Sequence, residues 1–262
     1  MSLIGLGPGD PSYLAQKAEK MLREAEVVAG YKTYLRLMPE ELLKGKETIS
    51  TGMKSEIERC ERAIDAALAG RSVAVVCSGD PGIYAMAGLV FELLEQRGLL
   101  GSLPVEVVPG IPAFCAAAAL LGAPLMHDFA SVSLSDLLTP WEAIERRVRA
   151  AAEADFVIVL SNPRSKQRSW QLERAVEILL ERRAPSTPVG VVRNASREGE
   201  SVWLTTLSEL DTQQVDMLCT LIIGSSRTRA LGSSMVTPRG YLDKYNGAGH
   251  DVQQERAGLM PR

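Results

Sequence analysis

The sequence predicts an α/β protein made of two domains. Short apolar runs rich in β-branched residues, such as 72–77, alternate with segments whose apolar residues recur at helical spacing, such as 83–96. Strands that appear as continuous apolar runs are typical of buried parallel sheets covered by helices. The alternation starts again after 122–129, and 262 residues suffice for two modest domains. The predicted organisation is a first domain at 1–124, a second at 125–245 and a disordered tail at 246–262.

A glycine loop follows the apolar run 72–77. Its residues, Ser78-Gly79-Asp80-Pro81-Gly82, cannot continue a strand or form a helix interior. In an open α/β sheet, such a loop lies at the carboxyl edge, where ligands bind. Asp80 has no lysine beside it and would repel a phosphate, whereas its carboxylate suits hydroxyls, an amine or another cationic group. The alternative interpretation is that Asp80 only caps the following helix.

Two further strands of the first half end in loops rich in glycine and proline. The strand 2–6 leads into Gly7-Pro8-Gly9-Asp10-Pro11, and 104–108 leads into Pro109-Gly110-Ile111-Pro112-Ala113. The first loop is similar to a dinucleotide fingerprint, but Asp10 stands where the third glycine should be. If the three strands share one parallel sheet, their loops can meet at one ligand. The other elements predicted here are helices 13–25, 55–69 (with a capping box, Ser55 to Glu58), 83–96 and 114–121, a strand 27–29 and a polar aromatic loop 30–34.

The second half repeats the pattern with less glycine at the strand ends. A helix is predicted to have Thr139 as its N-cap and Pro140 at its first helical position. The loops that follow its strands are Ser161-Asn162-Pro163-Arg164-Ser165 and Asn194-Ala195-Ser196. The strands predicted here are 130–134, 156–160, 189–193, 202–206 and 221–223, mixed in direction, with a further helix at 170–183.

The composition excludes several classes of protein. With 29 basic and 32 acidic residues the formal net charge is −3, and no apolar run reaches the ~18 residues of a membrane helix. We therefore expect neither nucleic-acid nor membrane binding, and no signal peptide because Met1 leads directly into a strand. The four cysteines are widely separated, which fits a reduced cytoplasmic protein. With only two histidines in addition, no metal site built by the protein is expected.

Four motifs, in this order, resemble the tetrapyrrole methylase family: GLGPGDP, SGDPGIY, PGIPA and NAS. The resemblance extends over the chain up to the predicted tail. It implies two α/β domains with S-adenosylmethionine (SAM) in the cleft between them, and a homodimer. Within the family, GYKTY, STGMKSEIERC and GAPLMHDFASVSLSDLLTPW resemble the enzymes that methylate C17 of precorrin-3B, or of cobalt-factor III, and contract the macrocycle in cobalamin biosynthesis.

The resemblance also implies which residues contact SAM. Pro112 departs from the family's pattern because it lacks a hydroxyl and an N–H, and Ser161 stands where close relatives often carry Tyr. The matching positions are Pro8, Ser78, Gly79, Asp80, Ile83, Pro112, Ala113, Leu160, Ser161, Asn194 and Ala195.

His127 and Asp128 are the candidate catalytic pair. An imidazole titrates near neutral pH, so the pair could move protons during ring contraction. The alternative is a hydrogen-bonded hinge pair. Basic side chains in or beside the second-half loops are expected to be mostly solvated, with one or two binding carboxylates of the macrocycle. They are Arg164, Lys166, Arg168, Arg193, Arg197, Arg227, Arg229 and Arg239.

The function expected from these observations is SAM-dependent C-methylation of a tetrapyrrole, with placement of the two reactants as the main catalytic device. One alternative is a sibling methyltransferase acting on uroporphyrinogen III or another precorrin. Another is a non-catalytic nucleotide-binding module that uses the first glycine loop. The sequence leaves open whether the substrate ring carries cobalt.

Overall fold

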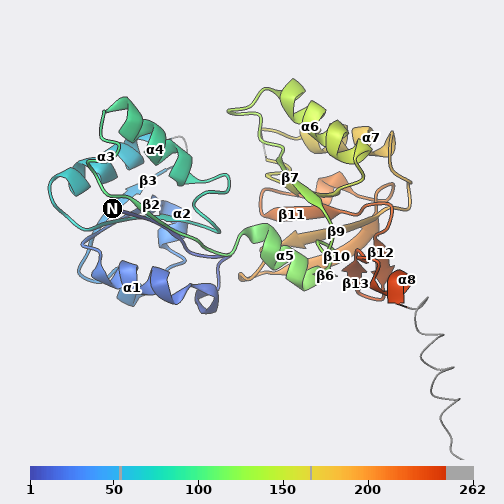
Figure 1. Ribbon diagram of the computed structural model, residues 1–262, viewed down its shortest axis with the longest axis horizontal. Coiled ribbons are helices and arrows are strands. Elements are labelled where there is room, and N and C mark those ends of the chain that lie inside the picture. Colours follow the sequence, from blue (N-terminus) through green and yellow to red (C-terminus); the bar gives the residue numbers. More distant parts are fainter. Residues whose placement is uncertain (53–54, 166, 246–262) are drawn as a thin grey trace, which may run out of the picture. The chain divides into compact units, whose positions relative to one another are not determined.

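The structure, a computed structural model, describes residues 1–52, 55–165 and 167–245. The tail predicted at 246–262 lies outside these residues. The chain divides into two compact units, each with its own sheet (Figure 1). The first unit is Met1–Leu120 with Val192–Val202, and the second is Leu121–Val191 with the chain from Trp203 onward. Residues 192–202 fall in the domain predicted at 125–245, but they belong to the first unit, to which Arg197 is hydrogen-bonded.

The first unit contains a parallel five-stranded sheet. Its strands are β1 (Ser2–Gly5), β2 (Val27–Tyr31), β3 (Glu47–Thr51), β4 (Val73–Cys77) and β5 (Glu106–Val108), in the order β3-β2-β4-β1-β5. Every neighbouring pair in this order runs parallel. The strands that precede the three glycine loops, β4, β1 and β5, are therefore adjacent and end at the same edge.

Helices cover both faces of this sheet, which explains why β4 is apolar throughout. Val73 and Val75 pack with residues of α3 (Glu56–Leu68) and α4 (Met86–Gln96). Ala74 and Val76 point to the opposite face and pack with residues of α1 (Gln16–Glu24). The other helices of this unit are α2 (Lys32–Leu35) and α5 (Ala113–Leu121), with 3-10 turns at Pro11–Tyr13 and Glu40–Leu42.

The second unit has a sheet of mixed direction, as the sequence predicted. Its strands are β7 (Phe129–Ser133), β8 (Val157–Ser161), β9 (Pro188–Arg193), β10 (Ser201–Thr206) and β11 (Cys219–Ile223), in the order β10-β9-β11-β8-β7. β7 and β8 run parallel, whereas β11 runs antiparallel to β8. A smaller sheet has the order β12-β13-β6, formed by β12 (Arg229–Leu231), β13 (Ser234–Val236) and β6 (Gly122–Ala123).

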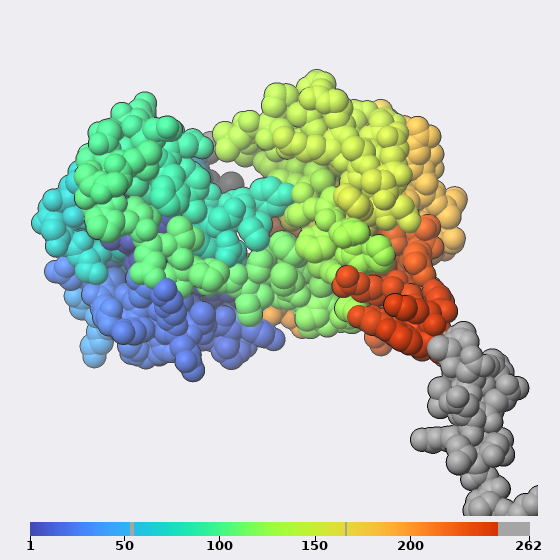
Figure 2. All heavy atoms as spheres, viewed as in Figure 1, coloured from blue at the N-terminus to red at the C-terminus, as the bar shows by residue number. Residues whose placement is uncertain are grey.

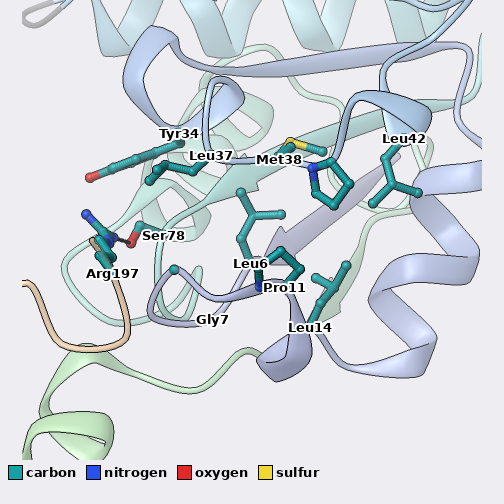
Figure 3. A pocket seen from close by; sticks show the side chains of 12 residues that line it. Leu6, Gly7, Pro11, Leu14, Tyr34, Leu37, Met38, Leu42, Ser78 and Arg197 are labelled. Carbon is teal, nitrogen blue, oxygen red and sulfur yellow. Dashed lines mark hydrogen bonds between the residues drawn. The ribbon is translucent and has the colours of Figure 1, made fainter. Parts of the chain in front are cut away.

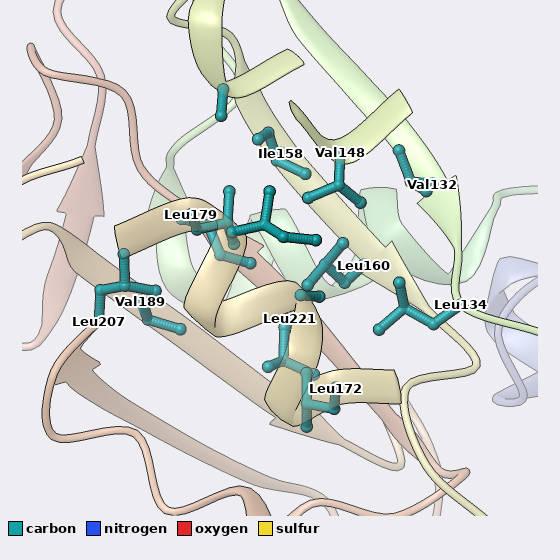
Figure 4. Packing of buried hydrophobic residues seen from close by; sticks show 14 of the residues in the cluster. Val132, Leu134, Val148, Ile158, Leu160, Leu172, Leu179, Val189, Leu207 and Leu221 are labelled. Carbon is teal, nitrogen blue, oxygen red and sulfur yellow. The ribbon is translucent and has the colours of Figure 1, made fainter. Parts of the chain in front are cut away.

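The core of the second unit lies between its large sheet and two helices. Ile144 and Val148 of α6 (Trp141–Glu153) and Leu172 of α7 (Trp170–Leu180) pack on Leu160 and Leu221 of the sheet (Figure 4). The outer side of α6, drawn in yellow-green, forms part of the molecular surface in Figure 2. The remaining elements are a 3-10 turn at Thr212–Gln214 and α8 (Tyr241–Tyr245). Among the described residues, no helix has both the length and the apolar character needed to cross a bilayer.

Local capping differs from the sequence prediction at two helices. The Ser55 side chain makes no capping hydrogen bond, and the Ser55 carbonyl instead accepts from Thr51 Oγ1 and from the N–H of Arg59. α6 begins at Trp141, with Pro140 at the N-cap. The Pro140 carbonyl accepts the first helical hydrogen bonds, from Ala143 and Ile144 N–H, so Pro140 has the role predicted for Thr139.

Candidate functional site

Three loops meet at the carboxyl edge of the first sheet, where β1, β4 and β5 end. Gly79 N donates to the Gly7 carbonyl at 2.7 Å, and Gly7 N donates to the Gly79 carbonyl at 3.2 Å. This pair joins the first loop to the second. A Cβ on Gly79 would lie 3.6 Å from Ala113 N and from Pro112 Cα, so the third loop is in contact as well. Pro8, Ser78, Gly79, Pro112 and Ala113 are thus brought together within one unit.

Glycine is required where these backbones cross. A Cβ on Gly5 would lie 2.5 Å from Gly110 N and 2.6 Å from the Gly79 carbonyl oxygen, and a Cβ on Gly110 would overlap that same oxygen. Distances of this kind are far below van der Waals contact, so a side chain would force the loops apart. The three loops therefore pack with main chain directly against main chain, and Gly5 and Gly79 are themselves buried there.

Asp80 ties the second loop to the third. Its Oδ1 accepts from Gly82 N at 2.8 Å and its Oδ2 accepts from Gly110 N at 3.1 Å. The interpretation of Asp80 as a helix cap is wrong, because α4 begins at Met86 with Ala85 at its N-cap. An ionised carboxylate can accept about four hydrogen bonds, so Asp80 keeps acceptor capacity for an amine or a hydroxyl of a ligand.

Arg197 brings a fourth segment to this edge. Its Nε donates to the Pro8 carbonyl at 2.6 Å and its Nη2 donates to Ser78 Oγ at 2.6 Å (Figure 3). The guanidinium stem occupies the space that a Cβ on Gly9 would need. Arg197 is therefore not a solvated surface residue, and burial lowers the pKa of its guanidinium. The sequence gives no local signal for this contact, because the bonded residues are 189 and 119 positions away.

The predicted residues Asn194 and Ala195 arrive on the same segment. Asn194 has φ +53°, and its carbonyl accepts from Arg197 N at 2.8 Å, which closes a tight turn. The Asn194 side chain donates to the Glu198 carbonyl at 3.2 Å, within its own loop, and Ala195 is buried. Asn194 therefore has a structural role in shaping the loop that presents Arg197.

An apolar pocket adjoins the first two loops. Leu6 and Leu14 lie on one side of it in Figure 3, with Leu37, Met38 and Leu42 on the other. Its polar end is formed by Tyr34, Ser78 and Arg197. Burial raises the pKa of the Tyr34 phenol, an effect that the positive charge of Arg197 opposes.

Tyr34 was not among the predicted site residues. The sequence feature that could have indicated Tyr34 is its place in the polar aromatic loop 30–34, which directly follows a strand. β2 runs to Tyr31 and α2 follows directly, which carries Tyr34 to the same sheet edge.

The second unit holds the remaining predicted residues at two opposite ends of its sheet. Leu160 is fully buried in the core, and Ser161 is the last residue of β8. His127 and Asp128 precede β7, which pairs with β8 from Phe129 with Val157 to Ser133 with Ser161. At ~3.3 Å per residue, the five-residue strand separates the two ends by about 16 Å. The structure therefore does not bring His127 and Asp128 next to Ser161.

The His127 ring is engaged by its neighbour. Its Nδ1 accepts from Asp128 N at 2.9 Å, which leaves Nε2 as the ring nitrogen that a substrate could reach. The two side chains are exposed, and Nδ1 lies 3.6 Å from Asp128 Oδ2. This contact is compatible with both the hinge and the proton-transfer interpretation.

Several basic side chains named from the sequence have structural partners. Arg168 is buried and donates to the carbonyls of Leu134 at 2.8 Å and Asn162 at 2.6 Å. Arg164 donates to the Thr212 carbonyl at 2.7 Å, and Arg227 pairs with Asp243 at 2.8 Å. Lys166 lies outside the described residues.

The cysteines and acidic groups of the described segments provide no further reactive centre. Burial raises the pKa of the Cys60 and Cys77 thiols to about 11, so both are neutral at physiological pH. In the part of the chain that the structure describes, no group of three His, Cys, Asp or Glu side chains is placed to hold a metal ion.

The edge of the first sheet fits SAM by its chemistry. Asp80 can accept from an amine or a ribose hydroxyl, and its charge complements a cationic group. The glycine backbones allow close approach, and the apolar pocket can cover an uncharged part of a ligand. No lysine lies in the three loops, so a phosphate-bearing ligand is less well matched.

Comparisons with known proteins agree on one family. The model described as Tetrapyrrole (Corrin/Porphyrin) Methylases matches residues 1–211. A relative from Salmonella typhimurium, named probable cobalt-factor III C(17)-methyltransferase, is 50% identical over 241 residues, which cover 92% of this chain and 99% of the relative. The cobalt-factor III methyltransferase of Priestia megaterium is 46% identical over 93% of this chain, which spans 45% of that longer protein.

Solved structures show the same relationship. The methyltransferase CobJ has a TM-score of 0.86 at 36% identity, covering 90% of this chain and 98% of CobJ. Uroporphyrin-III C-methyltransferase from Thermus thermophilus, solved with S-adenosylhomocysteine, has a TM-score of 0.62 at 27% identity, covering 85% of this chain and 96% of that chain. With the glycine loops and the parallel sheet that carries them, these matches identify the chain as a SAM-dependent member of the tetrapyrrole methylase family.

Proposed function

We propose that the protein methylates C17 of cobalt-factor III, or of metal-free precorrin-3B, and contracts the macrocycle in the same reaction sequence. The observation that carries this proposal is the 50% identity to the Salmonella relative, because the match spans 99% of that protein. The match to CobJ over 98% of its chain supports the same assignment. The two matches together extend over nearly the whole length of both relatives.

We propose that SAM binds against the three loops of the first unit. Bound SAM supplies an electrophilic methyl group on a sulfonium. Asp80 would bind the amine or the ribose, and the main chain around Gly79 would allow close approach. The full set proposed to contact SAM is Pro8, Ser78, Gly79, Asp80, Ile83, Pro112, Ala113, Leu160, Ser161, Asn194 and Ala195. Because Leu160 is fully buried in the core, its contribution would come from its main chain.

Methyl transfer to an electron-rich carbon requires alignment of the reacting atoms and exclusion of water more than it requires acids or bases. The residues described above can supply both, since the loops are joined by hydrogen bonds and the adjoining pocket is apolar. Ring contraction additionally requires a proton to move. We retain His127 and Asp128 as candidates for that step, since their side chains are exposed and lie within 3.6 Å of each other.

We also propose that the protein is a homodimer of the cytoplasm. The family resemblance implies the dimer, and a dimer can bury exposed apolar side chains such as Leu137 and Leu138. The four cysteines are free, with Cys115 exposed, which suits a reducing compartment. Sedimentation at micromolar concentration should give the mass of a dimer, and a monomer at every concentration would contradict the proposal.

The function is tested by assaying turnover with SAM on the cobalt-bound and the metal-free macrocycle side by side. Mass reports methylation and the absorption spectrum reports ring contraction. The proposal predicts that one of the two rings gains one methyl group and contracts. Turnover of uroporphyrinogen III alone would favour a sibling methyltransferase. A rise in melting temperature with NAD but not with SAM would favour a nucleotide-binding module.

A further inference from the structure

Arg59 is a buried cation whose bonded partners among the described residues, Thr51 and Met86, are neutral. It lies on α3 with 3% of its surface exposed. Its Nη1 donates to Thr51 Oγ1 at 2.6 Å, and its Nη2 lies 3.5 Å from Met86 Sδ, a weak acceptor. Within residues 1–52, 55–165 and 167–245, no Asp or Glu forms an ion pair with Arg59. Charged side chains buried to this degree are usually paired or bound to a ligand.

The Arg59 side chain lines a cavity beside the proposed SAM site. The cavity has a volume of about 90 Å³, several times the space that one water molecule needs. The cavity lies near the ends of β2 and β3 and is lined there by Tyr31, Tyr34 and Arg59. Ser78 and Ile83, which belong to the proposed SAM set, line the same cavity.

The other groups around the cavity complement an anion rather than a cation. Tyr34 and Tyr31 pack edge to face with their ring centroids 5.2 Å apart, and each phenol can donate a hydrogen bond. The Ser78 hydroxyl already accepts from Arg197, so its proton is available for donation to another acceptor. Burial keeps the Cys77 thiol neutral, so it does not neutralise Arg59. The Arg59 guanidinium has N–H groups for which the described residues provide no acceptor, and its planar fork is well shaped for a carboxylate.

We propose that Arg59 binds a ligand carboxylate in this cavity, with Tyr34 as a second donor. The inference rests on the proposed function, because that function determines which ligands carry the group. The carboxylate belongs either to the methionine part of SAM or to an acetate or propionate side chain of the tetrapyrrole. The chemistry of recognition is the same for both sources.

The test compares Arg59→Gln with the matched control Arg62→Gln. Arg62 lies on the same helix with its side chain half exposed, 3.6 Å from Glu58, so its substitution removes a charge without touching the cavity. Calorimetry measures the Kd of SAM, and absorbance titration measures the Kd of the tetrapyrrole in the presence of S-adenosylhomocysteine. Arg59→Gln should weaken one of these two ligands by about 10- to 100-fold, and Arg62→Gln should weaken neither.

The two arms identify the source. If the carboxylate is that of SAM, Arg59→Gln weakens SAM but leaves 5′-methylthioadenosine, which lacks the amino-acid part, unchanged. If it belongs to the macrocycle, the SAM Kd is unchanged and the tetrapyrrole Kd rises. A further measurement needs no variant: the wild type should bind S-adenosylhomocysteine more tightly than its methyl ester in the first case, and the tetrapyrrole acid more tightly than its ester in the second.

Two results would overturn the inference. One is a folded Arg59→Gln protein that binds both ligands as the wild type does. The other result applies if Arg59→Gln does not fold, and it uses Arg59→Lys, which retains the charge but not the planar fork. The inference is overturned if Arg59→Lys binds both ligands with wild-type affinity and the wild type binds the acids and their esters equally well. Either result leaves the proposed function standing, since methylation by the wild type is measured separately.

Discussion

The two units stabilise their strand ends in different ways, the first at the carboxyl ends of β1, β4 and β5 and the second at those of β7 and β8. In the first unit, main chain meets main chain at Gly5, Gly79 and Gly110, and one carboxylate, Asp80, bonds to two N–H groups. In the second, a buried guanidinium, Arg168, bonds to the carbonyls of Leu134 and Asn162. The first arrangement joins the loops without a side chain where the backbones cross, whereas the second places a side chain beyond the strand ends.

This difference indicates where a ligand can lie closest to the backbone. Arg168 bonds to the first carbonyl after each of β7 and β8 and so occupies space beyond those strand ends. At the first edge, Asp80 retains acceptor capacity for a ligand. We therefore expect changes at the first edge to affect SAM binding and a change at Arg168 to affect mainly stability.

The largest effect is expected from Gly110→Ala. The new Cβ would overlap the Gly79 carbonyl oxygen and separate the second and third loops. Overpacking of this kind costs about 1–3 kcal/mol of unfolding free energy, and SAM binding should fall below detection. Urea unfolding and calorimetry measure the two quantities. Gly88→Ala is the control, because a Cβ there meets nothing within 4 Å and alanine favours the α4 helix.

Arg168→Gln tests the second edge. The substitution removes two charge-assisted hydrogen bonds and leaves two carbonyls without their donor, which should lower the unfolding free energy by about 3 kcal/mol. The Kd of SAM should remain within a few-fold of the wild-type value. A loss of SAM affinity as large as that of Gly110→Ala would remove the distinction between the two edges.

Asp80→Asn separates charge from shape at the first edge. The amide oxygen can still accept from Gly82 N or Gly110 N, but the negative charge is lost. SAM should bind about 10- to 100-fold more weakly, as expected for hydrogen bonds to an ionised group. The unfolding free energy should change by only about 1 kcal/mol. Unchanged SAM affinity in this folded variant would contradict a ligand role for Asp80.

The smallest effect is expected from His127→Ala. If His127 only orders the start of β7, both methylation and ring contraction should proceed at close to the wild-type rate. If it transfers a proton, contraction should slow by about 10²–10⁴-fold and an uncontracted methylated ring should accumulate. Mass and absorption spectra of one reaction score both steps. Asp128→Asn should be compared next, because its carboxylate lies 3.6 Å from the ring.

Much of the first unit could be predicted from the sequence. A continuous apolar run such as Val73–Cys77 predicts a strand that is covered on both faces, and the glycine and proline residues after it predict where the strand ends. The convergence of three loops followed from parallel strands alone. β3 was not predicted, because its exposed residues Glu47, Thr48 and Ser50 lack an apolar pattern.

The contacts between distant side chains and main chain could not be predicted. Arg197 looks like an ordinary surface cation in the sequence, because its partners Pro8 and Ser78 are far along the chain. The helix at 83–96 was predicted three residues too early, since Ala87 N bonds to the Pro81 carbonyl and Tyr84 has φ +52°, which a helix does not allow. The position of His127 at the far end of β7 from Ser133 required the strand register.

Hydrogen exchange measured by mass spectrometry with and without SAM tests whether SAM binds at the first sheet edge. SAM should slow exchange in peptides covering the three loops at 7–11, 78–82 and 109–113, which are joined by hydrogen bonds at that edge. Peptides covering 126–129, at the far end of β7, should exchange at the same rate in both samples. Protection confined to the second unit, with unchanged exchange in all three glycine loops, would contradict the account.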